Sequence, residues 1–429
     1  MDPEPPRHDR LSVRVRRFFG EMGPGIVTGA ADDDPSGIST YSVTGATFGL
    51  SQLWTVFLTF PLMASVQLMC ARLALVCGEG LAATIRRRYP RWVLWTACSL
   101  LIVANVVNIG ADFAGMAESL EMVTGLTRYA WLPVLAAGIV LALVFWSYHR
   151  LAGIFKWLTL VLFAYVFAAF LAKPHWPEVL EATFVPRIEW TSSYLTTLVA
   201  ILGTTITPYM FFWQAAQEVE EERDKGRRSF RSRQGASKEE LATANRDVLF
   251  GMGWAGVAMY FIILTTAVTL HKPGAPPIET AQQAAEALKP LAGKGAYLLF
   301  ALGLVGTGVL AIPVLGGSAA YAVAEAMHFR GSLSDKPRVG RKFYYVLVAA
   351  ILVGLALDLF RVNAVRALFY AAIVNGVLAP PLVIIVTKLT SDPKVMGDLV
   401  APRLVRALGW ATGIAMAVAA AAMIGSLGH

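Results

Sequence analysis

Residues 23–50, GPGIVTGAADDDPSGISTYSVTGATFGL, place three consecutive acids inside an otherwise apolar stretch. An acid at the centre of a membrane span costs about 2.5 to 3.5 kcal/mol on the insertion scale, so acids there usually serve a function. Pro35 follows the third acid, and proline removes a backbone donor and disfavours helix in the preceding residue. The stretch therefore predicts a membrane helix interrupted near Asp34, where a carboxylate and freed carbonyls form a site for a hard cation.

The composition also indicates a membrane protein, because 56% of the 429 residues are hydrophobic and only 15% are charged. A soluble domain carries roughly 25% charged residues, so a soluble globular protein is excluded. Since a membrane helix needs about 20 apolar residues, we expect an all-α polytopic membrane protein with about eleven transmembrane helices. The expected spans are roughly 23–48, 51–76, 92–116, 129–147, 154–172, 194–217, 247–270, 295–327, 342–360, 363–388 and 404–427.

A second interruption is expected in residues 198–222, LVAILGTTITPYMFFWQAAQEVEEE. Here Thr204, Thr205 and Thr207 precede Pro208, which should break the sixth span near its middle. The first and sixth spans begin two successive sets of five. Paired broken helices at corresponding positions indicate a 5+5 inverted-repeat transporter with its site at the bilayer midplane.

The net charge of +8 arises from basic residues that lie between the apolar segments, so it reflects positive-inside topology and not a nucleic-acid partner. The most basic segments lie on the same side of the membrane as the N-terminus, which predicts that the N-terminus is cytoplasmic. We expect a multi-pass protein of the plasma membrane, in a bacterium the inner membrane. The expected plan is a cytoplasmic tail at 1–20, one transmembrane domain at 21–428 with repeats at about 21–173 and 194–388, an extra helix at about 404–427, and a cytoplasmic loop at 223–246.

Asp34 is the first candidate ligand, and its neighbours Asp32 and Asp33 are candidates for the ion pathway. The alternative is that the interruption lies at the membrane edge and the acids are merely hydrated. Thr204 and Thr207 lie three residues apart on one helical face and are candidate ligands at the second interruption. Membrane threonines often bond their own backbone four residues back, and this alternative stays open, most of all for Thr204.

The third expected span carries a polar stripe, because Asn105, Asn108 and Asp112 recur at i, i+3 and i+7. Such a stripe must face protein or water and not lipid. The asparagines could form an interhelical hydrogen-bond ladder, whereas Asp112 is a candidate for an ion or proton path. In the tenth span, Asn375 is a lone polar group and a candidate site contact. None of the six histidines falls in the middle of an expected span, so imidazole ligands are not expected.

These features resemble the NRAMP family of divalent metal transporters, which share the LeuT-like inverted-repeat fold. The likeness rests on the Gly-Pro-Gly start, the Asp-Pro break, the break from Gly203 to Pro208 and the eleven-span plan. The family's first-helix motif is Asp-Pro-Gly-Asn, so the resemblance keeps the ligand at Asp34 and puts Gly37 at the ligand Asn. Its sixth-helix motif is Met-Pro-His with an alanine three residues before the methionine, which puts Thr204 at the alanine and Thr207 at the methionine.

Other positions also depart from the family. Tyr209 stands at the histidine after the proline, Gln214 at the second histidine, and Gly115 at the glutamate that accompanies Asp112. Those missing groups serve proton movement in the family, and the resemblance makes Tyr209 and Gln214 candidates for the ion pathway. Asn375 corresponds to the tenth-helix glutamine. The departures resemble the NRAMP-related magnesium transporter branch, in which the methionine is also lost.

The resemblance therefore implies transport of divalent cations, Mg²⁺ and/or Mn²⁺, by alternating access and without proton coupling. A thioether favours softer metals, whereas an all-oxygen site suits Mg²⁺, which keeps several waters. We expect the cation and the bilayer as partners, no nucleic acid, no cofactor and no enzymatic activity. The alternatives are a proton-coupled Mn²⁺/Fe²⁺ transporter, a cation-coupled transporter of an organic substrate such as an amino acid, and a membrane enzyme acting on a prenyl diphosphate. That enzyme would need a second Asp-rich stretch, which the sixth span lacks.

Overall fold

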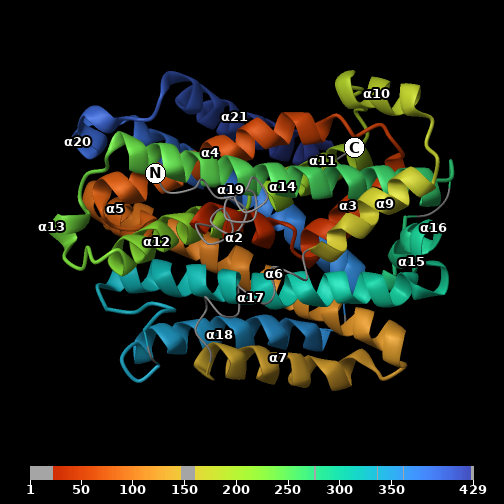
Figure 1. Ribbon diagram of the computed structural model, residues 1–429, viewed down its shortest axis with the longest axis horizontal. Coiled ribbons are helices and arrows are strands. Elements are labelled where there is room, and N and C mark those ends of the chain that lie inside the picture. Colours follow the sequence, from red (N-terminus) through yellow and green to blue (C-terminus); the bar gives the residue numbers. More distant parts are fainter. Residues whose placement is uncertain (1–22, 146–159, 275–276, 336, 361, 427–429) are drawn as a thin grey trace, which may run out of the picture.

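The computed structural model describes residues 23–145, 160–274, 277–335, 337–360 and 362–426, and within these ranges it contains helices and no β-strand. Long helices lie side by side along one direction, with short helices at both ends of the bundle (Figure 1). The α-helices are α2 (Pro24–Asp32), α3 (Pro35–Phe48), α4 (Thr55–Cys77), α5 (Leu81–Arg88), α6 (Arg91–Thr124), α7 (Arg128–Phe145), α9 (Phe163–Leu171), α10 (Trp176–Phe184), α11 (Ser192–Thr205), α12 (Pro208–Asp224), α13 (Phe230–Arg233), α14 (Lys238–Leu270), α15 (Ala281–Ala285), α16 (Lys289–Ala292), α17 (Ala296–Met327), α18 (Arg341–Leu357), α19 (Ala364–Ser391), α20 (Pro393–Met396) and α21 (Arg403–Ser426). Short 3₁₀ segments are η1 (Leu160–Leu162), η2 (Glu286–Leu288), η3 (Gly293–Gly295), η4 (Asp358–Phe360) and η5 (Gly397–Leu399).

Eight helical stretches of the described chain are long and apolar enough to cross a membrane. The interrupted pair α11 and α12 counts as one of them. The three other expected spans correspond to the interrupted pair α2 and α3, to η1 with α9, and to α18, which has 17 residues. Residues 146–159, where the fourth expected span ends and the fifth begins, lie outside the described residues, as does the expected tail at 1–20.

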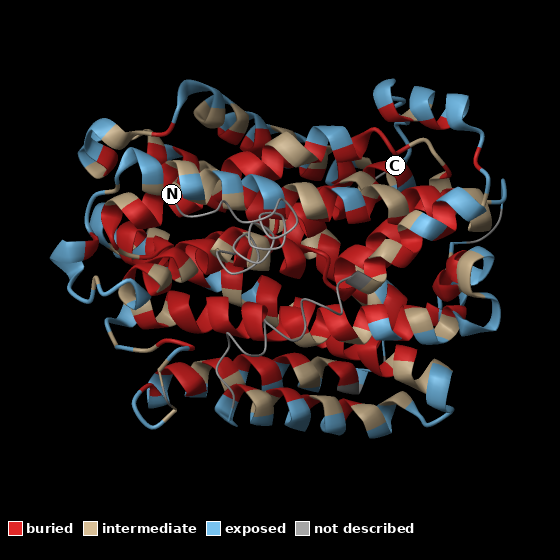
Figure 2. Cartoon of the chain, viewed as in Figure 1, coloured by how far each residue is buried: buried red, intermediate tan, exposed pale blue. Residues whose placement is uncertain are grey.

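Both broken helices lie in the buried interior, where small residues let backbones approach closely (Figure 2). α2 crosses α14 with glycine against glycine: a Cβ on Gly29 would overlap the backbone of Gly251, and a Cβ on Gly251 would overlap the carbonyl of Gly25. α11 meets α19 in the same way, because Gly203 lies against the backbone of Gly376. Each broken helix is therefore held by a long, continuous neighbour.

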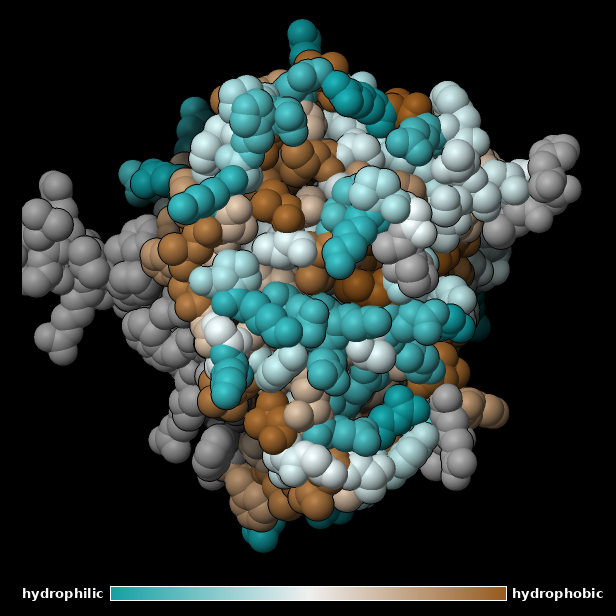
Figure 3. Space-filling model, turned by 90° about the vertical axis from the view of Figure 1, so that its right-hand side faces the viewer, coloured by the Kyte–Doolittle hydropathy of each residue, from teal (hydrophilic) through white to brown (hydrophobic). Residues whose placement is uncertain are grey.

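The segments that the charge pattern assigns to the two sides of the membrane gather at opposite ends of the bundle. α5, α13 and α20 lie at one end, whereas α10, α15 and α16 lie at the other (Figure 1). Figure 3 views this second end directly and shows hydrophilic side chains gathered across it beside hydrophobic patches. The arrangement agrees with helices that cross a bilayer from end to end.

The expected loop at 223–246 is shorter than predicted. α12 continues to Asp224, α13 occupies part of the middle, and α14 already begins at Lys238. α14 begins early because Ser237 and Glu240 form a capping box, in which each side chain accepts a hydrogen bond from the other residue's backbone N–H. The non-helical stretches of this segment are therefore 225–229 and 234–237.

Candidate functional site

The first interruption separates α2 from α3 at the three acids, and all three side chains are at most 1% exposed. α2 ends at Asp32, and Asp34 is the N-cap of α3. The Asp34 Oδ1 atom accepts hydrogen bonds from the Ser36 hydroxyl at 2.7 Å and from the Gly37 backbone N–H at 2.8 Å. Asp34 therefore satisfies donors that the new helix leaves open, which is why an Asp-Pro pair begins a helix here. The structure buries these acids, so they do not lie at a wet membrane edge.

The second interruption lies beside the first. Thr207 is the N-cap of α12, but its side chain makes no capping bond; its buried hydroxyl has no hydrogen-bond partner in the described part of the chain. The Thr204 hydroxyl lies 3.3 Å from the Ser36 hydroxyl of the first interruption. Thr205, in contrast, bonds back to the Ile201 carbonyl at 2.9 Å. Thr204 thus faces the first interruption, and Thr205 bonds within its own helix. The buried Thr207 hydroxyl stays a candidate ligand at the second interruption.

Two backbone carbonyls lose their helical donors at these breaks, because a proline stands four residues after each. Pro35 stands where the donor to the Ala31 carbonyl would be, and Pro208 stands where the donor to the Thr204 carbonyl would be. Tyr209 replaces the first donor, since its hydroxyl bonds to the Ala31 carbonyl at 2.8 Å. The Ala31 carbonyl thus accepts a side-chain hydrogen bond, and the Thr204 carbonyl, which lacks its helical donor, is a candidate cation ligand.

A chain of side-chain hydrogen bonds crosses the site from α3 through α6 to α19. The Asn108 amide donates to the Asp34 Oδ2 atom at 2.9 Å, and the Asn375 amide donates to the Asn108 Oδ1 atom at 3.4 Å. All three side chains are at most 1% exposed. Asn105 has a different role, because its amide bonds to the Leu315 carbonyl and the Ser318 hydroxyl of α17. Within the polar stripe on α6, Asn108 therefore belongs to the site, whereas Asn105 connects α6 to α17.

Several buried oxygens at or near the interruptions have no hydrogen-bond partner in the described ranges. They are Asp32 Oδ1, both carboxylate oxygens of Asp33 and of Asp112, and the hydroxyl of Thr207. The same ranges contain no cluster of three or more His, Cys, Asp or Glu side chains placed to hold a metal ion. Asp34 remains the best-placed carboxylate. Gly37 was a predicted ligand position, but it has no side chain to coordinate a cation, and its backbone N–H donates to Asp34.

The predicted pathway residue Gln214 connects the first broken helix to the far end of α12. Its Oε1 atom accepts from the Thr28 hydroxyl at 2.6 Å, and its amide donates to Glu218 at 2.9 Å. Glu218 lines a cavity of about 360 Å³ beside the start of α2, together with Glu221, Lys225, Ser237, Glu239, Glu240 and Asp247. A polar route therefore leads from the interior of the bundle to an acidic cavity.

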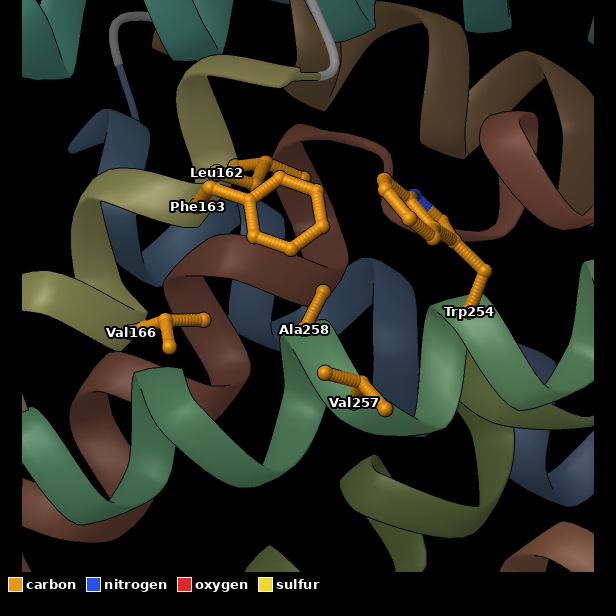
Figure 4. A pocket seen from close by; sticks show the side chains of 6 residues that line it. All are labelled: Leu162, Phe163, Val166, Trp254, Val257 and Ala258. Carbon is orange, nitrogen blue, oxygen red and sulfur yellow. The ribbon is translucent and has the colours of Figure 1, made fainter. Parts of the chain in front are cut away.

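A second pocket has no ionic character. Leu162, Phe163, Val166, Trp254, Val257 and Ala258 line it between α9 and α14 (Figure 4). The Phe163 and Trp254 rings pack edge to face, with their centroids 4.4 Å apart. This apolar pocket lacks the oxygen donors that a hard cation requires.

Sequence reasoning missed Asn108 and Ser36 as site residues. Asn108 stood in the polar stripe that was recognised on α6, so the signal was present, but nothing in it showed which asparagine faces Asp34. Ser36 stands two residues after Asp34, and no sequence pattern predicts that its hydroxyl bonds to the Asp34 carboxylate.

A model of the family described as "Natural resistance-associated macrophage protein-like", or Nramp, matches residues 25–426. The chain belongs to the Nramp family. This confirms the resemblance drawn from the sequence, and it makes the chain a transporter and not an enzyme.

Curated relatives match nearly the whole chain. A protein of Mesorhizobium japonicum named "Divalent metal cation transporter MntH" is 28% identical over 412 residues, which cover 93% of this chain and 87% of the relative. A protein of Deinococcus radiodurans with the same name is 28% identical over 414 residues, which cover 93% and 88%.

Solved structures of related architecture confirm the fold class. A manganese transporter of Eremococcus coleocola, solved with an aromatic bis-isothiourea substituted compound, superposes with a TM-score of 0.75 at 20% identity, covering 98% of this chain and 87% of the transporter. Mhp1, a nucleobase-cation-symport-1 family transporter in a closed conformation, superposes with a TM-score of 0.58 at 16% identity, covering 95% and 93%. The Nramp chain therefore has the expected all-α transporter fold with broken first and sixth helices.

Proposed function

We propose that this Nramp protein carries divalent metal cations across the plasma membrane by alternating access. Its cargo is Mg²⁺ and/or Mn²⁺, which moves without proton coupling. The observation that carries the proposal is the buried chain from Asp34 through Asn108 to Asn375, which lies where the two broken helices meet. Names of the relatives support divalent cations as cargo, and the name of the Eremococcus structure supports manganese.

The donor atoms support a hard cation. Asp34 offers a carboxylate, Thr207 a free hydroxyl, Asn375 an amide oxygen, and Thr204 a backbone carbonyl, so every candidate ligand is oxygen. At the second break, Thr207 offers a hydroxyl oxygen, where a methionine would offer sulfur. A site with oxygen ligands alone favours Mg²⁺ and Mn²⁺ over softer metals.

The number of free positions supports a hydrated cargo. A carboxylate has about four lone-pair positions, and Asp34 already uses three of them for Ser36, Gly37 and Asn108. A cation at this site would therefore gain few direct protein contacts and would keep water in its shell. Mg²⁺ loses water reluctantly, so it suits such a site.

Transport without protons is supported by the groups that occupy the relay positions. Tyr209 is committed to the Ala31 carbonyl, and Gln214 is an amide that bridges Thr28 and Glu218. An amide does not titrate in the physiological range, so the polar route lacks a proton acceptor at Gln214.

The membrane potential can drive uptake in place of protons. An inside-negative potential supplies roughly 2.3 kcal/mol per charge per 100 mV, and about twice that for a divalent cation.

The orientation is part of the same proposal. The basic segments α5, α13 and α20 gather at one end of the bundle, and the positive-inside rule assigns that end to the cytoplasm. The acidic cavity beside Glu218 then opens on the cytoplasmic side, where it would attract divalent cations.

The test is uptake of Mg²⁺ and of Mn²⁺ into liposomes that contain the purified full-length chain, with internal pH recorded at the same time. We expect uptake of both ions, driven by an inside-negative potential, without acidification. The control is Asp112→Asn, which should leave internal pH equally unchanged. Metal-dependent acidification at zero potential, in fixed proportion to uptake and lost in Asp112→Asn, would contradict uncoupled transport.

A further inference from the structure

Asn108 lies between the two predicted ligands Asp34 and Asn375, and its atoms define which of their oxygens are free. Its amide nitrogen donates to Asp34 Oδ2, and its amide oxygen accepts from Asn375. The Asn108 nitrogen is a hydrogen-bond donor and cannot coordinate a cation, and the Asn108 oxygen faces the Asn375 amide. Asn108 therefore contacts both predicted ligands, and both ends of its amide are used in these contacts.

The bond to Asp34 has no substitute in the neighbouring helices. The two other side-chain and backbone bonds of the Asp34 carboxylate come from Ser36 and Gly37, and both reach Oδ1. Those bonds belong to the first turn of α3 and move with it. Among the described residues, Asn108 is the only side chain from another helix that donates a hydrogen bond to this carboxylate, and it fixes Oδ2 relative to α6.

The bond to Asn375 orients the second predicted ligand. An amide side chain has donors on one side and an acceptor on the other. Because the Asn375 nitrogen points to Asn108, its carbonyl oxygen points away from Asn108. Reversing the Asn375 amide would place two amide oxygens against each other, so Asn108 keeps the Asn375 oxygen available.

We infer that Asn108 is a positioning residue for the cation site: it holds the Asp34 carboxylate and turns the Asn375 amide so that both present oxygen to a divalent cation. This inference rests on the proposed function. It extends the site to α6 and gives a role to a polar residue on the buried face of that helix. It also separates Asn108 from Asn105, which lies one turn earlier on the same helix.

Asn105 provides a matched control, because it has the same side chain, the same helix and 1% exposure, but it bonds to α17 and not to the site. We would purify the full-length chain with Asn108→Leu, Asn108→Asp or Asn105→Leu. Mn²⁺ affinity would be measured by calorimetry, KM and maximal rate by uptake into liposomes, and thermal unfolding in detergent.

A positioning role predicts that Asn108→Leu weakens Mn²⁺ binding at least tenfold and raises KM to a similar extent. Asn108→Asp should weaken binding at least fivefold, because an ionised carboxylate cannot donate to Asp34. Asn105→Leu should keep both values within twofold, even where its unfolding temperature falls. A merely structural role would instead lower the unfolding temperature of both leucine variants and leave both affinities unchanged.

The nearly isosteric Asn108→Asp variant decides between positioning and coordination and keeps the volume of the side chain. If Asn108 were a ligand, the carboxylate would bind Mn²⁺ as well or better, and that result would overturn the inference. Wild-type affinity in Asn108→Leu would overturn it as well. Failure of the wild-type chain to bind and carry either Mg²⁺ or Mn²⁺ would instead overturn the proposed function, and the inference with it.

Discussion

The Tyr209 hydroxyl donates a 2.8 Å hydrogen bond to the backbone carbonyl of Ala31. This bond joins the first turn of α12 to the last turn of α2, and it supplies the donor that Pro35 cannot provide. The two helix interruptions are therefore mechanically connected, although they lie far apart in the sequence. A movement of α2 must break this bond or carry α12 with it.

Removing this hydroxyl should destabilise the observed arrangement. Tyr209→Phe leaves a buried carbonyl without a donor, which costs about 1 to 3 kcal/mol. We expect a lower unfolding temperature in detergent. The matched control is Tyr165→Phe, because the Tyr165 hydroxyl is also buried but has no hydrogen-bond partner among the described residues. Equal unfolding temperatures for the two variants would argue against the role of the Ala31 bond.

Selectivity should shift when sulfur is placed at the second interruption. Thr207→Met introduces a thioether, which should raise Cd²⁺ or Mn²⁺ transport relative to Mg²⁺. Gly37→Asn should strengthen the shift, and a Cβ at Gly37 would meet its nearest neighbours at 3.4 Å, an ordinary contact. The measurement is competitive uptake of the ions into liposomes.

The control for selectivity is Thr205→Val, because Thr205 bonds the Ile201 carbonyl of its own helix and should not affect the ion ratio. An unchanged Mg²⁺ to Mn²⁺ ratio in the double variant of Thr207 and Gly37 would mean that the ions are discriminated elsewhere.

At the crossing of α2 and α14, a side chain larger than glycine should destabilise the protein. Gly29→Ala places a methyl group into the Gly251 backbone, and overpacking of this kind costs about 1 to 3 kcal/mol or more. We expect loss of transport and a lower unfolding temperature. Gly138→Ala is the control, because a Cβ there would meet nothing within 4 Å. Wild-type uptake by Gly29→Ala would show that the helices can separate without cost.

The start of α2 should loosen when its carboxylate partner is neutralised. Asp247 of α14 accepts the backbone N–H groups of Gly23 at 3.1 Å and Gly25 at 2.5 Å, and its negative charge favours a helix N-terminus. We expect Asp247→Asn to speed amide hydrogen exchange in α2 several-fold, as followed by mass spectrometry.

Glu239→Gln is the control for this exchange experiment, because Glu239 lines the same cavity but has no hydrogen bond to α2 within the described residues. If both variants exchanged as slowly as the wild type in α2, the Asp247 contact would not restrain this helix.

The sequence predicted the interruptions well because their cause is local. Pro35 and Pro208 each remove one donor, and the effect falls on neighbouring residues whatever the rest of the chain does. The roles of Asn108 and Asn105 could not be assigned in the same way. Helical spacing places both on one face of α6, but whether each meets α3, α17 or α19 depends on packing between distant segments.

Two other features show the same limit. Tyr209 and Gln214 each have a hydrogen-bond partner on α2, nearly two hundred residues earlier, and no local sequence pattern predicts these partners. The early start of α14 has a local cause, because Ser237 and Glu240 have the spacing of a capping box. The polar composition of 223–246 nevertheless favoured the prediction of a loop. Apolar periodicity thus located the spans better than it located their polar ends.

The most direct test of cation transport through this site is uptake of Mn²⁺ and Mg²⁺ by liposomes that contain Asp34→Asn, compared with the wild type at equal protein content. Asparagine preserves the shape of the side chain but removes its charge. We predict that Asp34→Asn inserts, purifies as the wild type does and carries neither ion above the rate of empty liposomes. Uptake of either ion at the wild-type rate would contradict the proposed site.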